Sequence, residues 1–334
     1  MTNSSPLLHG APPELAQIQE PVRGRLDQVL EEIRRIVAAD FDRIKEVNGY
    51  LLLMPGKLFR PTLVLLANEV GGQPHRHAIT FGATVELVHL ATLVHDDAVD
   101  NSVLRRGQPT VNALWTHQIA IIMGDYLYSR ALTELARVRR LDAIEILGDA
   151  ANIMSIGEMR QLTAYDALDF SEEDYYRLIS AKTASLMRAA CEMGASLGEN
   201  GYREELGKFG HALGMAFQVA DDILDYEGSE EETGKPVGHD LRERKVTLPL
   251  VGALKAASVQ EAGLIREFFT QAEPPDQEIF RMVALVRELG GVDYARRKAV
   301  EYAEQAEEAL KGLPEGPALA SLRDSITYVV HRDR

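Results

Sequence analysis

Long segments with the apolar spacing of an α-helix dominate the sequence, and strand-like alternation of apolar and polar residues is nearly absent. The spacing predicts helices over 13–38, 40–53, 58–71, 76–102, 111–137, 139–166, 171–197, 201–228, 246–257, 260–272, 276–289, 292–311 and 316–331. Glycine and proline, which number 26 and 14 among 334 residues, fall mainly between these segments. The predicted fold class is therefore all-α.

Three of the segments, 81–95, 118–135 and 211–225, are apolar almost all round. Such segments are typical of central helices that other helices enclose. We find neither a linker rich in proline, glycine or serine nor a repeat of fixed period. We therefore expect one domain over residues 1–334, a large bundle of about ten or more helices around a central cavity, with residues 1–12 as a flexible N-terminal segment.

The charge and cysteine content exclude several functions. The chain has 51 acidic and 36 basic side chains, a formal charge of −15, which argues against a nucleic-acid partner. The single cysteine, Cys191, forms no internal disulfide and gives no zinc-binding pattern. The start of the chain lacks the basic and apolar parts of a signal peptide, and the longest uncharged stretch, 107–124, contains several polar residues. We expect a cytoplasmic protein without a transmembrane segment.

Two aspartate clusters end two of the apolar segments, and both read Asp-Asp-x-x-Asp. The first consists of Asp96, Asp97 and Asp100, and the second of Asp221, Asp222 and Asp225. Residues four apart lie on one helix face, so each cluster can present two carboxylates to a common point. Carboxylates that leave water positions open suit Mg²⁺ when the metal also binds substrate phosphates. A single cluster could simply be solvated surface, but two copies at helix carboxyl ends, where negative charge is unfavourable, favour bound cations.

Basic side chains accompany both clusters. They are Lys57, Arg60, Arg105, Arg106, Lys182, Lys235 and Lys245. Each of them alone is most simply an exposed surface residue. Arginine binds phosphate through two hydrogen bonds and lysine supplies a mobile charge, so the set together indicates diphosphates held by metal ions and basic side chains.

The ordered motifs resemble the trans-isoprenyl diphosphate synthases, the polyprenyl synthetase family, from about residue 20 to the end. They are Gly56-Lys57-x-x-Arg60-Pro61, Glu86-x-x-His89, His95-Asp96-Asp97-x-x-Asp100, Arg105-Arg106-Gly107, Lys182-Thr183, Phe217-Gln218-x-x-Asp221-Asp222-x-x-Asp225, and the stretch from Gly234-Lys235 through Asp240-Leu241 to Lys245-x-Thr247-Leu248-Pro249. The resemblance implies the isoprenoid synthase fold, with the bundle surrounding a substrate cavity. It also implies a homodimer, and the apolar 111–137 helix could supply the interface.

The resemblance also implies a role for each motif residue. Isopentenyl diphosphate would be bound by Lys57, Arg60, His89 and Arg106, and the allylic diphosphate by Arg105, Lys182, Thr183, Gln218, Lys235 and Lys245. Asp96, Asp100 and Asp221 would be direct ligands of Mg²⁺, three ions per active site, with Asp97, Asp222, Asp225 and Asp240 in support. His89 could instead be a core histidine, and we expect His95 to pack or to orient its neighbours.

The implied reaction begins when metal ions and basic groups stabilise the departing allylic diphosphate. The double bond of isopentenyl diphosphate attacks the resulting carbocation, and loss of a proton leaves an allylic product one isoprene unit longer. Water would quench the cation. We therefore expect the polar loop 228–244 to close over the site.

The product length follows from the residues four and five places before the first aspartate. In relatives that stop at about fifteen or twenty carbons a bulky residue usually stands there, one helical turn before the cluster. Here these places hold Thr92 and Ala91, with Val88 one turn further back. Small residues would let the product descend, which predicts about thirty to forty-five carbons, as in the octaprenyl synthases that supply quinone side chains. Alternatively, Ala91 and Thr92 only allow close helix packing.

Four other functions remain open. They are a terpene cyclase, which usually carries an Asn/Ser/Glu second metal motif, a short-chain farnesyl or geranylgeranyl synthase, a noncatalytic subunit of a heteromeric synthase, and a purely structural helical protein. The chain departs from the family pattern at Pro55, Leu58 and Ala98. Leu58 replaces a common basic residue, which puts the affinity for isopentenyl diphosphate in doubt but not the reaction class.

Overall fold

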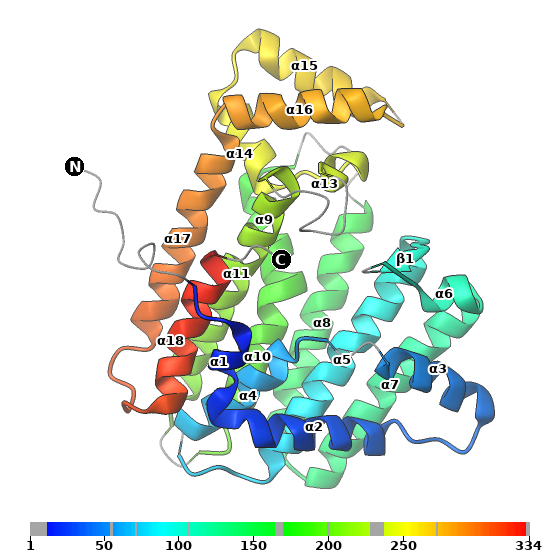
Figure 1. Cartoon of the computed structure of the whole chain (residues 1–334), viewed down its shortest axis with the longest axis vertical. Helices are drawn as coiled ribbons and strands as arrows, with labels where there is room; N and C mark the ends of the chain where they lie inside the picture. Colours follow the sequence, from blue (N-terminus) through cyan, green and yellow to red (C-terminus); the bar gives the residue numbers. More distant parts are fainter. Residues whose placement is uncertain are drawn as a thin grey trace.

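The computed structural model describes residues 12–53, 56–70, 72–105, 107–163, 170–198, 201–227, 237–271 and 273–331, and these are almost entirely helical (Figure 1). Within these ranges the only strands are β1 (Leu104–Arg105) and β2 (Gln108–Pro109), which pair antiparallel directly after the first aspartate cluster. The prediction of an all-α bundle is confirmed.

The helices follow one another with short connections. In the first half they are α1 (Leu15–Ile18), η2 (Glu20–Val22), α2 (Arg23–Ile36), α3 (Asp42–Leu52), α4 (Phe59–Val70), α5 (His77–Val99), α6 (Val111–Leu114), α7 (His117–Val138) and α8 (Leu141–Thr163). In the second half they are α9 (Glu172–Ile179), η4 (Ser180–Ala184), α10 (Ser185–Ala195), α11 (Arg203–Glu227), α13 (His239–Arg242), α14 (Leu248–Ala256), α15 (Val259–Thr270), α16 (Asp276–Glu288), α17 (Gly291–Ala309) and α18 (Pro317–Val330).

Three predicted helices are interrupted. Segment 13–38 forms α1, η2 and α2, with Pro21 in the first turn of η2. Segment 111–137 breaks at Trp115, after which the Thr116 hydroxyl accepts the Ile119 N–H and begins α7. Segment 171–197 begins with α9, where Ser171 and Asp174 form a reciprocal capping box. That segment nevertheless changes to a π-helical turn, η4, between α9 and α10.

Helices α4, α5, α10 and α11 form the centre of the bundle. Almost every side chain of α4 and α10 is buried, and so are most of those on α5 and α11. The prediction that 81–95 and 211–225 are enclosed is therefore confirmed. The prediction for 118–135 is wrong in part, because α7 leaves Ile121 and Ile122 41% and 60% exposed on its outer face.

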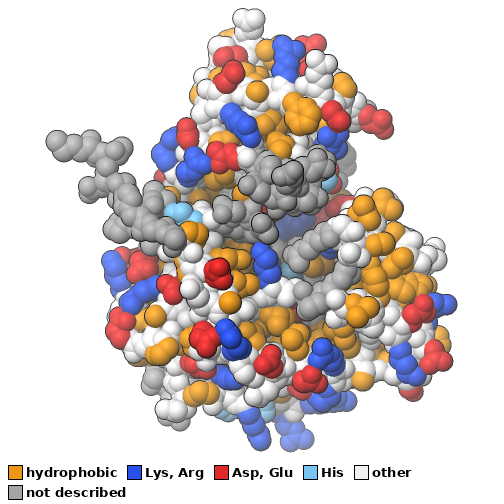
Figure 2. Space-filling model, viewed as in Figure 1, with side chains coloured by type: hydrophobic (Ala, Val, Ile, Leu, Met, Phe, Trp, Pro, Cys, Tyr) orange, Lys and Arg blue, Asp and Glu red, His pale blue; other side chains and the backbone are white. Residues whose placement is uncertain are grey.

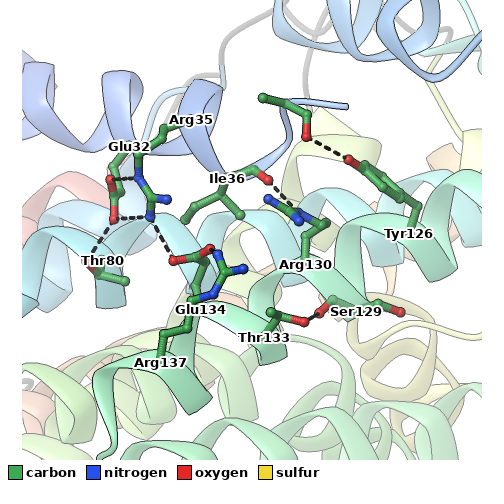
Figure 3. Close-up of polar contacts among 11 residues, drawn as sticks. Glu32, Arg35, Ile36, Thr80, Tyr126, Ser129, Arg130, Thr133, Glu134 and Arg137 are labelled. Carbon is green, nitrogen blue, oxygen red and sulfur yellow. Dashed lines mark hydrogen bonds and ion pairs between the residues drawn. The ribbon is translucent and has the colours of Figure 1, made fainter. Parts of the chain in front are cut away.

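Polar side chains on α7 anchor the carboxyl end of α2 (Figure 3). Arg130 Nε donates to the carbonyl of residue 36 at 2.5 Å, and the Tyr126 hydroxyl donates to that of residue 37 at 3.1 Å. Arg35 of α2 in turn donates to the buried Glu134 of α7 at 2.8 Å. These contacts satisfy carbonyls that a helix end leaves unpaired.

One described helix, α5, is long and apolar enough to cross a membrane by length and composition, and 56% of its most apolar window is buried inside the bundle. A second hydrophobic cluster joins α9, α11 and the helices from α14 to α17. The α15–α16 pair lies at one extreme of the molecule, beyond α13 (Figure 1). Helices α5 and α11, which carry the aspartate clusters, end on the side of the bundle where β1 and α13 lie.

Candidate active site

The first aspartate cluster ends α5. Asp96 is half-buried, Asp97 is buried and Asp100, the residue that ends the helix, is exposed. Arg105 on β1 donates from Nε to both carboxylate oxygens of Asp97, at 2.9 and 2.8 Å. Asp97 therefore holds the Arg105 guanidinium through Nε. The two terminal nitrogens carry the remaining N–H donors of this guanidinium. The second position of this cluster is bonded within the protein, whereas the first is half-buried and the third is exposed.

The second aspartate cluster lies near the end of α11. Asp221 is exposed, but Asp222 is buried and accepts from the Tyr175 hydroxyl at 2.6 Å and from Gln218 Nε2 at 2.9 Å. Asp225 accepts the backbone N–H groups of residues 239 and 240, both at 3.0 Å. Asp225 therefore anchors the start of α13, and with it the end of the 228–244 loop.

Two lysines interact with carboxyl groups of the site. Burial raises the pKa of Asp96 to about 6, and Lys182 of η4 opposes this shift. Lys245 follows α13 and interacts with both Asp240 and Asp100. Burial acts to lower the pKa of Lys245, but Glu243 and these two carboxylates outweigh it and raise that pKa. Groups that are more than a hundred residues apart in sequence therefore share one site.

Asp240 adds a further carboxyl group, half-buried, beside the second cluster. Burial and the neighbouring Asp225 raise its pKa to about 7, although Lys245 opposes the shift. Burial, together with Asp240, also raises the pKa of Asp222 well above its ordinary value. Carboxyl groups that are difficult to ionise in this way are those that a nearby cation would stabilise most.

The side chains around Lys182 and Thr183 complete the site. Lys182 Nζ donates to Gln161 Oε1 at 3.1 Å and forms an ion pair with Glu158, both on α8. Thr183 is buried and donates to Gln218 Oε1 at 2.7 Å. Sequence reasoning missed Glu158, Gln161 and Tyr175. The Glu158-x-x-Gln161 spacing on α8 was the available signal for the first two.

Lys57 and Arg60, predicted to bind isopentenyl diphosphate, flank the start of α4. Lys57 is exposed, with Nζ 3.4 Å from the Tyr328 hydroxyl, and Arg60 is half-buried. Between them Leu58 adopts a left-handed φ of 51°, which is unusual for a leucine. Two further residues have a left-handed φ beside predicted site residues. Residue 101, at 51°, directly follows Asp100, and residue 244, at 59°, directly precedes Lys245. Left-handed backbone thus accompanies three predicted site residues, although Arg139, which is not among them, also adopts it.

The other predicted residues lie along α5 or outside the described ranges. Val88 and Ala91 are buried, and Thr92 and His89 are half-buried. His95 Nε2 lies 3.1 Å from the Ile121 carbonyl oxygen, so His95 joins the end of α5 to α7. Predicted site residues Arg106 and Lys235, together with most of the 228–244 loop, lie outside the described residues. The expectations for these two residues and for closure of the loop therefore stay predictions.

The donor set fits Mg²⁺ bound together with a phosphate ligand. Among the described residues no three His, Cys, Asp or Glu side chains converge closely enough to hold a metal ion. Mg²⁺ is usually held by one or two carboxylates, several waters and substrate phosphates rather than by an all-protein cage. The predicted ligands Asp96, Asp100 and Asp221 are half-buried or exposed and would supply a sparse set of oxygen donors of this kind.

An all-α bundle with two carboxylate clusters and several basic side chains at one end is typical of enzymes that bind diphosphates together with divalent cations. Residues 41–286 match the family model described as polyprenyl synthetase. The chain belongs to this family, so the resemblance stated from the sequence is confirmed. It is accordingly a prenyltransferase of the isoprenoid synthase fold, from a family that uses Mg²⁺.

Individual relatives agree with this assignment. The chain is 35% identical to an octaprenyl diphosphate synthase of Haemophilus influenzae over 301 residues, 90% of this chain and 91% of that protein. It is 36% identical to a heptaprenyl diphosphate synthase component 2 of Geobacillus stearothermophilus, over 92% and 96% of the two chains. A polyprenyl synthase of Caulobacter crescentus, solved with calcium and isoprenyl diphosphate, superposes with a TM-score of 0.92 at 31% identity, covering 98% of this chain and all of that one.

Proposed function

We propose that this protein is a polyprenyl diphosphate synthase that condenses isopentenyl diphosphate head to tail with an allylic diphosphate and makes a long-chain product. The observation that carries the proposal is that Lys182 and Lys245 both interact with the first aspartate cluster, and that Lys245 also interacts with Asp240, which lies beside the second cluster. Carboxylates bind divalent cations and lysines bind phosphate oxygens, so together they would stabilise a departing diphosphate. The long-chain relatives support the same reaction.

The residues of this chain would divide the work as follows. Lys182, Lys245 and Arg105 would hold the allylic diphosphate, and Mg²⁺, three ions at each site, would supply Lewis-acid stabilisation of the departing group. Lys57, Arg60 and His89 would hold isopentenyl diphosphate so that its double bond reaches the allylic carbon. Lys182, which forms an ion pair with Glu158, would exchange this carboxylate for a phosphate oxygen when the substrate binds.

A long product follows from the α5 face below the first cluster. Ala91 is buried and Thr92 half-buried, and Thr92 donates its hydroxyl to the carbonyl of residue 89 at 2.7 Å. Neither side chain is bulky enough to block a growing tail. We propose a product of about thirty to forty-five carbons. In that case Ala91→Phe or Thr92→Tyr shortens the product, and an unchanged length in both variants would contradict this course of the channel.

A homodimer in the cytoplasm is the assembly that we propose. Helices α7 and α8 expose Ile121, Ile122, Ile153, Ile156, Met159 and Leu162. Hydrophobic side chains also gather over β1 and α6 (Figure 2). Apolar exposure on this scale is typical of protein interfaces. Sedimentation of the wild type and of Ile122→Lys tests the assembly, because the charge should favour the monomer if α7 lies in the interface.

The test of the reaction is elongation by the pure chain. We expect incubation with farnesyl diphosphate, labelled isopentenyl diphosphate and Mg²⁺ to give long-chain products, and chelation of the metal to stop their formation. Failure to elongate any allylic primer would reject the proposal. Elongation only after another protein is added would instead favour a component of a heteromeric synthase, like the relative that is called component 2.

A further inference from the structure

The helix that carries Lys182 and Thr183 contains one π-helical turn. The Ser185 N–H donates to the carbonyl of Ser180, five residues earlier, where an α-helix would bond four residues back. Regular helix precedes this turn as α9 and follows it as α10. Isolated π-turns inside α-helices are rare and often mark functional sites. This one contains both motif residues, and the sequence pattern gave no sign of it.

Side chains satisfy the polar groups around the turn. The Ser185 hydroxyl donates to the carbonyl of Ala181 at 2.6 Å. Ser180 Oγ lies 2.9 Å from Nε2 of His211 on α11. Burial, reinforced by Arg188, lowers the pKa of His211, so its imidazole is neutral and can share one proton with the hydroxyl. These bonds offset the irregular backbone of the turn.

Two glycines on neighbouring helices make room for the turn. A Cβ added at Gly157 of α8 would lie 2.7 Å from the Cβ of Ala181, and one at Gly214 of α11 would lie 2.5 Å from the Cα of Ala184. Both distances are too short for carbon atoms in contact. The π-turn is therefore in close contact with both α8 and α11, and a methyl group at either glycine would push it away from its present position.

Within the turn, the consecutive residues Lys182 and Thr183 contact different helices. Lys182 reaches Gln161 and Glu158 on α8, whereas Thr183 reaches Gln218 on α11 and through it Asp222. The turn thus lies between the two helices that complete the site. A small rotation of its backbone would move both side chains together.

We propose that the Ser180–Ala184 turn is a positioning device, held by Gly157, Gly214 and His211, that sets Lys182 and Thr183 for the allylic diphosphate. This rests on the proposed function, because the ligand of these two residues is the allylic substrate. Gly157, Gly214 and His211 are positioning residues that touch no substrate. Their effect should appear in the allylic KM and not in the KM for isopentenyl diphosphate.

The test adds a methyl group at Gly157 and then removes the one at Ala181, the residue it would contact. We expect Gly157→Ala to raise the KM for farnesyl diphosphate about 10- to 100-fold, the scale of a misplacement near 1 Å, and to leave the KM for isopentenyl diphosphate within about twofold. Gly148→Ala, on the same helix with nothing within 4 Å of the added Cβ, should change neither constant. Adding Ala181→Gly to Gly157→Ala removes the clashing methyl group and should restore most of the allylic KM.

Ser180→Ala adds no atom and keeps the test valid if Gly157→Ala does not fold. It should raise the allylic KM alone, by a smaller factor. The proposal is overturned if Gly157→Ala and Ser180→Ala leave the allylic KM unchanged, if both substrates weaken equally, or if Ala181→Gly does not rescue. A wild-type chain that elongates no primer would instead contradict the proposed function.

Discussion

The two aspartate clusters share one motif but differ in how the protein uses it. In both, the middle carboxylate is buried and bonded within the protein, Asp97 to Arg105 and Asp222 to Tyr175 and Gln218. The third positions differ, because Asp100 is exposed whereas Asp225 accepts two backbone N–H groups of α13. The two clusters therefore use the second position alike and the third position differently, so the shared motif does not by itself decide which carboxylates are bonded within the protein.

The largest expected effect is at the first positions. Asp96→Asn and Asp221→Asn should each lower kcat/KM by about 100- to 1,000-fold, because each removes a negative ligand from the cations that stabilise the leaving group. Neither change should lower the free energy of unfolding in the absence of metal. Steady-state kinetics and urea unfolding measure the two quantities. Near-normal activity in either variant would break the comparison.

The second positions should matter first for stability. Tyr175→Phe removes a hydrogen bond to the buried carboxyl group of Asp222 and should lower the free energy of unfolding by about 1–3 kcal/mol. Tyr176→Phe is the matched control, since that neighbouring hydroxyl bonds to the more accessible Glu172. Tyr176→Phe should lower the free energy of unfolding by less. Equal losses of this free energy in urea unfolding would contradict a larger contribution from the bond to buried Asp222.

The third positions should respond in opposite directions. Asp225→Ala removes the acceptor for two N–H groups at the start of α13 and should cost about 0.5–2 kcal/mol, like other lost helix caps. Asp100→Ala removes negative charge from a helix carboxyl end and should cost nothing, or gain about 0.3–1 kcal/mol. Thermal unfolding without Mg²⁺ measures both. Similar losses in the two variants would mean that the clusters are built alike.

A further effect concerns pH. The pKa of Asp96, about 6, lies above its unfolded value near 3.8, so the folded protein binds more protons between these values. Its contribution to stability is therefore present at low pH and is lost as the pH rises through about 6. Asp240, with a pKa of about 7, acts in the same direction. Metal-free melting temperatures should fall across this window, and Asp96→Asn should flatten the fall, whereas an unchanged slope would argue against burial of this carboxyl group.

Sequence patterns predicted the helices and both clusters because these depend on local spacing. The π-turn at Ser180–Ala184 could not be predicted, since it depends on Gly157 and Gly214, which are distant in sequence and meet it only in the fold. The left-handed Leu58 was equally hidden, because leucine rarely adopts that conformation. Periodicity also could not distinguish α7, which has an exposed apolar face, from the enclosed α5.

The roles within the clusters needed the third dimension as well. The resemblance implied Asp96, Asp100 and Asp221 as direct ligands, and these three lie at the surface of the site, less enclosed than Asp97 and Asp222. No pattern in the sequence indicates that Tyr175 bonds to Asp222 or that Asp225 begins α13, because both contacts cross between separate helices. The assignment of ligands stays a prediction.

Calorimetric titration with farnesyl thiodiphosphate, which binds without reacting, tests the central claim most directly. The wild type should bind it far more tightly with Mg²⁺ than without. Asp221→Asn should lose most of this metal dependence, whereas Asp225→Asn, in the same cluster, should keep it. Equal loss in both variants, or binding that does not depend on Mg²⁺ in the wild type, would contradict the division of roles between the positions of the motif.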